Sequence, residues 1–127
     1  MPSISPSLRY KDAARAIEFL VDAFGFERVE VHENEDGTIA HAELSYGDGM
    51  VMLGTDRPGD QYGSHVGQSW VYVVVEDADA HYAQAKAGGA EIVRELTDQD
   101  YGSRDYSARD PEGNLWSFGT YSPELPA

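Results

Sequence analysis

The sequence predicts an α+β fold of two tandem β-α-β-β-β modules, which form a curved, mostly antiparallel eight-stranded sheet with helices on the outer face. The main observation is an internal repeat. In each half, an aspartate precedes a helical pattern and a glycine follows it: Asp12 and Gly25 in the first half, Asp77 and Gly89 in the second. The offsets of 65 and 64 residues are about half of the 127-residue chain. A fixed internal period indicates two copies of one unit that bury their apolar faces together.

The first module covers about residues 1–58. Asp12 is expected to cap its helix, and Gly25 lies where a left-handed C-cap residue ends a helix. Asp36-Gly37 is a strong hairpin signal, and Gly47-Asp48-Gly49 marks the next turn. The spacing of apolar residues predicts a strand at 5–10, a helix at 13–24 and strands at 27–33, 38–46 and 50–54.

A connector at about residues 55–68 is rich in glycine, aspartate and proline. Loops of this length often act as lids or binding loops, although His65 within it is most simply a solvated side chain. The second module covers about residues 69–122. Its expected elements are a strand at 69–75, a helix ending at 87 with Asp77 or Asp79 as its cap, an extended stretch at 91–96 and a closing hairpin of 103–109 and 114–120.

Composition bounds the function. The length fits one compact domain, residues 1–127, with an adequate core. The 9 lysines and arginines against 23 acidic residues give a net charge of −14, which argues against a nucleic-acid partner. The negative charge has two interpretations: it attracts cationic ligands, or it only keeps the protein surface soluble. The absence of cysteine excludes thiolate chemistry and disulfides. No long apolar run or signal peptide is visible, so we expect a cytoplasmic protein without membrane contact.

Side chains alternate across strands, so each strand has two faces. One set suits packing under the helices: Ala40, Ala42, Leu44, Tyr46, Val51, Leu53, Val71, Val73, Val75, Trp116 and Phe118. The opposite set is Ile39, His41, Glu43, Ser45, Met50, Met52, Trp70, Tyr72, Val74, Leu115 and Ser117. If the sheet curves, this second face is mostly apolar with a few polar groups, as in small-molecule pockets. The candidate ligand-binding residues are Trp70, Tyr72, Met50, Met52, His41, Glu43, Ser117 and, from the closing hairpin, Tyr106.

Each candidate has an alternative role. Trp70 and Tyr72 are either a platform for a ligand or residues of a core or dimer interface. His41 and Glu43 share a strand face, so they are an acid–base pair, two metal ligands or a hydrogen-bonded surface pair. The residues alone leave these alternatives open.

Three features together resemble the vicinal-oxygen-chelate superfamily, which includes glyoxalase I, extradiol dioxygenases, fosfomycin-resistance enzymes and bleomycin-resistance proteins. They are the duplicated module pattern, the first helix ending in Phe24-Gly25-Phe26, and the run RDPEGNLW at residues 109–116. The resemblance covers nearly the whole chain. It is typical of a fold rather than of an activity, which depends on the site.

The metalloenzymes of this superfamily bind one divalent ion through His, Glu or Gln at four strand positions. The resemblance places these positions at Ser5, Met52, Trp70 and Ser117, and none of these residues is a competent ligand. A catalytic ion needs about three nitrogen or oxygen ligands from the protein. The resemblance therefore implies the non-metal, bleomycin-resistance-like branch, without a cofactor. A metal site that departs from the family pattern would use His41, Glu43 and His65.

This branch implies a homodimer that binds a small, cationic and aromatic molecule, of which antibiotic sequestration is one form. Trp70 and Tyr72 suit ring stacking, and Glu43 and the acidic charge suit a cation. The alternative is an enzyme: a glyoxalase-like lyase or isomerase, or a dioxygenase. It would act through an atypical metal site or through a metal-free acid–base pair of His41 and Glu43.

Overall fold

The computed structural model describes residues 2–124 and contains two helices and eight strands. The first module comprises β1 (Ser7–Tyr10), α1 (Ala13–Phe24), β2 (Glu27–Glu33), β3 (Ile39–Tyr46) and β4 (Gly49–Thr55). The second comprises β5 (Trp70–Val74), α2 (Ala78–Ala87), β6 (Glu91–Asp98), β7 (Arg104–Arg109) and β8 (Leu115–Gly119). The expected α+β fold and its two β-α-β-β-β modules are confirmed. The predicted domain, residues 1–127, also includes residues 1 and 125–127, which lie outside the described part.

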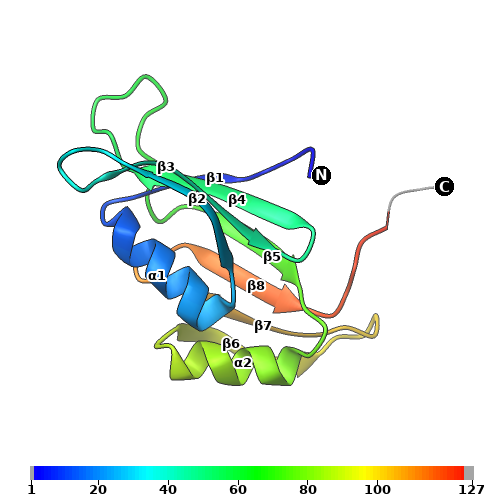
Figure 1. The fold of residues 1–127 in the computed structure, drawn as a ribbon. Helices are drawn as coiled ribbons and strands as arrows, with labels where there is room; N and C mark the ends of the chain where they lie inside the picture. Colours follow the sequence, from blue (N-terminus) through cyan, green and yellow to red (C-terminus); the bar gives the residue numbers. More distant parts are fainter. Residues whose placement is uncertain (1, 125–127) are drawn as a thin grey trace.

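The strands form two four-stranded sheets in place of the single eight-stranded sheet that the sequence suggested (Figure 1). Their orders are β1-β4-β3-β2 and β5-β8-β7-β6. In each sheet, the first strand of the module pairs in parallel with the last, and the other pairs are antiparallel. β1 and β5 are each the edge strand of their own sheet. Within the described residues, no strand of one sheet is hydrogen-bonded to a strand of the other.

Both helices begin and end where the sequence predicts. The side chain of Asp12 accepts a hydrogen bond from the backbone N–H of Arg15 at 3.1 Å. Gly25 has a φ of 78° and donates its N–H to the carbonyl oxygen of Leu20. Asp77, one of the two predicted caps, accepts from Ala80 N at 3.0 Å and begins α2. Side-chain capping of this kind satisfies N–H groups that have no partner within a helix.

The core lies where the two modules meet. α1 contacts the strands of the first sheet, α2 contacts three strands of the second, and the two helices contact each other (Figure 1). The ring of Phe24 lies 4.7 Å from that of Phe118 and 5.7 Å from that of Trp116, measured between centroids. Trp116 and Phe118 are fully buried, as the alternation pattern predicts. Aromatic pairs at these separations stabilise a core beyond simple area burial.

Two strand details differ from the prediction. β1 begins at Ser7, two residues later than expected. Ile39 was expected on the open face, but it is only 2% exposed and belongs to the core. The pairing of β2 with β3 shifts register between His32 and Glu33, and Glu33 lies opposite Ile39. Such a bulge changes which face a side chain points to.

A buried polar cluster connects the modules. The Tyr10 hydroxyl donates to the Asp110 carboxylate at 2.7 Å, and Trp116 Nε1 donates to the same carboxylate at 3.1 Å. The Asn114 side-chain amide adds a third donor at 3.1 Å. A buried carboxylate is tolerated only when donors surround it in this way. Neither helix of the described chain is long and apolar enough to cross a bilayer.

Candidate functional site

The open face of the second sheet presents an aromatic ring that is exposed and yet held in place. Trp70 is 72% exposed, and its indole Nε1–H donates to Ser117 Oγ at 2.9 Å. Ser117 Oγ in turn lies 2.8 Å from Ser107 Oγ. Tyr72 and Val74 follow on the same face of β5, as predicted from the alternation of this strand. The face therefore combines apolar surface with a short hydrogen-bonded chain that fixes the indole.

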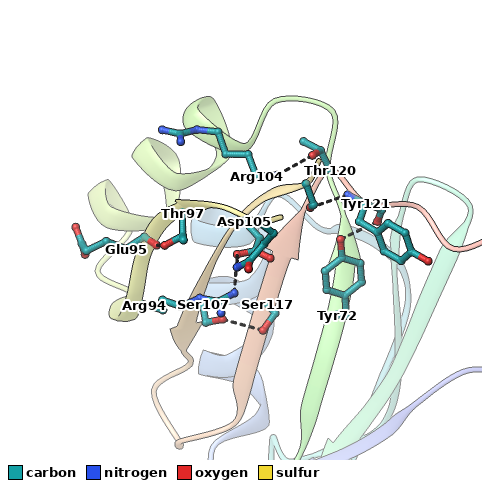
Figure 2. A network of polar contacts seen from close by, with 12 residues as sticks. Tyr72, Arg94, Glu95, Thr97, Arg104, Asp105, Ser107, Ser117, Thr120 and Tyr121 are labelled. Carbon is teal, nitrogen blue, oxygen red and sulfur yellow. Dashed lines mark hydrogen bonds and ion pairs between the residues drawn. The ribbon is translucent and has the colours of Figure 1, made fainter. Parts of the chain in front are cut away.

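A network of polar side chains borders this open face of the second sheet (Figure 2). The buried Asp105 carboxylate accepts from Arg94 at 2.5 Å and from Gln99 Nε2 at 3.0 Å. The Tyr72 hydroxyl donates to the carbonyl oxygen of Tyr121 at 2.7 Å. Burial is the main reason why the pKa of Tyr72 is raised, so the phenol remains a neutral donor. This network fixes the end of the open face that lies away from Trp70.

The open face of the first sheet carries the other polar candidates. His41 Nε2 lies 2.9 Å from Glu43 Oε2, which confirms that the two side chains share a face. Glu43 has two cross-strand neighbours: Met52 of β4 on one side and Glu30 of β2 on the other. His32 lies opposite His41 on β2, and its Nε2 is 3.2 Å from Glu30 Oε2. This face therefore offers two imidazoles, two carboxylates and the thioether of Met52.

One candidate from each module borders a cavity. Met50 and Tyr72 both line a cavity of about 800 Å³ between the modules. Trp70 and Ser117, and likewise His41, lie outside its wall. The structure thus divides seven of the predicted site residues among two open sheet faces and one inter-module cavity, and Tyr72 belongs to both a face and the cavity.

Tyr106 does not lie with the other candidates. It is fully buried on the core side of β7, opposite Phe118. Its hydroxyl lies 2.5 Å from His81 Nδ1, and His81 Nε2 lies 2.8 Å from the carbonyl oxygen of Phe24. Burial lowers the pKa of His81, so the neutral ring donates through Nε2 to Phe24 and accepts from Tyr106 through Nδ1. The sequence signal for this burial is the hairpin register. Tyr106 pairs with Phe118, and directly opposite residues share a sheet face, so the core assignment of Phe118 applies to Tyr106 as well.

The four positions that the resemblance assigns to metal ligands do not fit a divalent ion. Ser5, Met52, Trp70 and Ser117 offer two hydroxyls, a thioether and an indole, and a hard or borderline cation prefers carboxylates and imidazoles. The hydroxyl of Ser117 is also engaged with Trp70 and Ser107.

The alternative ligand set is not brought together either. His65 lies in the connector, beside a smaller cavity of about 280 Å³ that includes Ser7 and Arg9, and its Nε2 is 2.8 Å from the Tyr62 carbonyl oxygen. His41 and Glu43 lie outside that cavity. Over residues 2–124, no three histidine, aspartate or glutamate side chains gather as a metal site would require.

Comparison with known proteins agrees with the fold. The family model described as Glyoxalase/Bleomycin resistance protein/Dioxygenase superfamily matches residues 4–118. An uncharacterized protein of Mycobacterium bovis is 34% identical over 125 residues, which cover 93% of this chain and 82% of that protein. TioX from Micromonospora sp. ML1 superposes with a TM-score of 0.81 at 38% identity and covers 94% of this chain and 98% of TioX. A glyoxalase I mutant from Zea mays, with a TM-score of 0.72 at 20% identity over 92% of this chain and 44% of its own, shares the fold. This chain therefore belongs to the glyoxalase/bleomycin resistance protein/dioxygenase superfamily.

Proposed function

We propose that the protein binds a small, planar aromatic molecule on the open face of the second sheet and performs no chemistry on it. The observation that carries this proposal is the indole of Trp70, which is 72% exposed but anchored through Ser117. An exposed ring usually moves, and fixing it before the ligand arrives lowers the entropic cost of binding. Planar rings stack on such a surface, and stacking adds to the gain from burial.

The family contains binding proteins beside the enzymes that its description names. Its description includes bleomycin resistance proteins, and sequestration of an antibiotic is the finer form of this proposal. The non-metal branch is part of the same proposal, because Met52 and Trp70 replace the expected ligands. A binding protein of this kind acts by mass action and needs no catalytic group.

We further propose a homodimer in which the partner covers this face. Trp70, Tyr72 and Val74 form an exposed apolar strip along β5. Large apolar strips on a soluble protein usually mark an interaction site. The face with Glu30 and Glu43 has the opposite character, and a cleft formed by one face of each kind would suit an aromatic cation.

The test is a thermal-shift panel of glycopeptide and quinone antibiotics, thiol adducts and divalent metal ions against the purified protein. A ligand that raises the melting temperature of the wild type should lose most of this effect in Trp70→Ala. Tyr62→Ala is the matched control, because Tyr62 is also exposed, at 71%, but lies in the connector. Sedimentation measures the oligomeric state of the same samples. A stoichiometric divalent ion in the purified protein, or an undiminished shift in Trp70→Ala, contradicts the proposal.

One observation favours a second candidate function. The 2.9 Å contact of His41 with Glu43 is the geometry of an oriented general base. In this alternative, the protein is a metal-free lyase or isomerase of the glyoxalase type. Turnover of a thiol adduct that disappears in both His41→Asn and Glu43→Gln would favour it over simple binding.

A further inference from the structure

The inter-module cavity lies beside the start of α2, away from Trp70. Its volume is about 800 Å³, within the range of small-molecule sites. Its wall includes the β3–β4 turn, the whole of β5 after Trp70, the cap residue Asp77 and one side of α2 with Ala80, His81 and Gln84. The side chains that give it an apolar and aromatic character are Phe26, Tyr46, Met50, Val71, Val73 and Val75.

The internal repeat provides a closed counterpart to this cavity. At the start of α1, the closing hairpin of the other module fills the equivalent space. The Glu112 carboxylate accepts from the backbone N–H groups of Lys11 and Asp12 at 2.6 and 2.8 Å. The ring of Tyr10 fills the space below, with its hydroxyl on Asp110.

At the start of α2, the same positions hold different residues. Val75, which precedes Asp77 as Tyr10 precedes Asp12, has no hydroxyl and is smaller. The turn between β3 and β4 is only Gly47-Asp48, and among the described residues no carboxylate reaches the backbone there as Glu112 does at α1. At α2, therefore, the space that Tyr10 and the closing hairpin fill at α1 remains an open cavity.

The charges at this opening have one sign. Asp48, Glu76 and Asp77 line the cavity, and no lysine or arginine belongs to its wall. Tyr46 lies beside them, its ring 5.5 Å from Phe26 and 5.9 Å from His81. Burial and, after it, the charge of Glu76 raise the pKa of Tyr46. Asp77 also caps α2. An aromatic ring next to several carboxylates attracts a cation both by cation–π interaction and by Coulomb attraction.

We propose that this cavity binds an organic cation with an apolar body, independently of the Trp70 face. The cationic group would lie at Asp48, Glu76 and Asp77, and the body would lie against Tyr46 and the valines of β5. The cavity shares Tyr72 and Val74 with the Trp70 face, but its carboxylates and Tyr46 lie outside that face. Binding of the cationic group therefore does not depend on the function proposed above.

Fluorescence anisotropy with two dyes tests the proposal. Rhodamine 6G is a cation and fluorescein an anion, and both carry the same xanthene ring. We expect saturable binding of rhodamine 6G to the full chain and none of fluorescein. Glu76→Gln should raise the Kd of rhodamine 6G about fivefold or more, since it removes a charge at the site. Glu35→Gln makes the same change in net charge in the exposed β2–β3 turn and should leave the Kd unchanged.

A steric variant provides a second arm. Ala80 is exposed on α2 and lines the cavity, so Ala80→Phe should fold and obstruct the entrance, with at least about a tenfold loss of affinity. Ala83→Phe, also exposed on α2 but outside the cavity wall, is the matched control. Trp70→Ala removes the stacking surface of the other face, so the comparison of Glu76 with Glu76→Gln is repeated in this background, where we expect the same loss of about fivefold. The proposal is overturned if rhodamine 6G does not bind saturably, if Glu35→Gln weakens binding as much as Glu76→Gln, or if only Trp70→Ala removes it.

Discussion

The phenol of Tyr10 donates a 2.7 Å hydrogen bond to the buried carboxylate of Asp110 and so fixes the first strand of one module to the last hairpin of the other. Burial is the largest reason why the pKa of Tyr10 is raised, and the charge of Asp110 adds to it. The phenol is therefore a permanent donor at neutral pH. Trp116 and Asn114 share the same carboxylate.

Tyr10→Phe should lower the free energy of unfolding by about 1–3 kcal/mol, because it leaves a buried carboxylate with one donor fewer. Urea unfolding followed by circular dichroism measures this change. Tyr62→Phe is the control, since Tyr62 is exposed in the connector. Equal stabilities of the two variants would show that the bond contributes nothing.

Gly88→Ala tests the contact between the two helices. A Cβ atom at position 88 would lie 2.6 Å from Ala23 Cβ and 2.7 Å from Ala23 Cα, so α1 and α2 would have to separate. Overpacking of this kind costs about 1–3 kcal/mol. Gly49→Ala is the matched control, since its Cβ would lie 3.5 Å from the nearest atom, an ordinary contact. A Gly88→Ala variant that melts with the wild type would contradict the close approach.

The buried His81 should make stability dependent on pH. Burial lowers the pKa of this imidazole in the folded protein, whereas in the unfolded chain it binds a proton at about pH 6.5. As pH falls through that value, the unfolded state holds more protons than the folded state, so the free energy of unfolding falls. The loss continues until the pH reaches the lowered pKa.

His81→Gln removes this titration while it keeps an amide that can donate to the carbonyl oxygen of Phe24. Urea titrations between about pH 7.5 and 5.5 should give a shallower pH dependence for this variant than for the wild type. His32→Gln, on an exposed strand, should keep the wild-type dependence. Parallel curves for wild type and His81→Gln would refute the linkage.

Ser117→Ala tests whether the indole of Trp70 is held. The chain contains two tryptophans, and Trp116 is fully buried, so each indole N–H gives a separate signal in a ¹H–¹⁵N spectrum. We expect the Trp70 signal to shift and exchange faster with water in Ser117→Ala, and the Trp116 signal to stay. Any ligand of this face should bind severalfold more weakly, because the ring is no longer fixed. Ser45→Ala, on the first sheet, is the control.

Local sequence signals were sufficient for the elements themselves. Asp12, Gly25 and Asp77 act through groups a few residues away, so their capping roles could be predicted. The alternation on β5 also predicted which of its side chains are exposed, since a strand has only two faces.

Long-range pairing was beyond these signals. Whether the edges of β1 and β5 meet depends on how two modules dock, which no local pattern encodes. The burial of Ile39 depends on a register shift in the partner strand, and the placement of Tyr106 on its pairing with Phe118. The cavity at α2 likewise depends on how the modules dock, because residues of both modules line it.

The bond between residues 10 and 110 also has a consequence for synthesis. The first module leaves the ribosome long before the hairpin that carries Asp110 and Glu112 exists. Until then, the Tyr10 hydroxyl lacks the Asp110 carboxylate, and the backbone N–H of Asp12 lacks the Glu112 carboxylate. The ring of Phe24 also lacks Trp116 and Phe118. Contacts this distant in sequence form late. The nascent half-chain therefore exposes an apolar face during translation, and the last residues of β8 complete the core of the first helix.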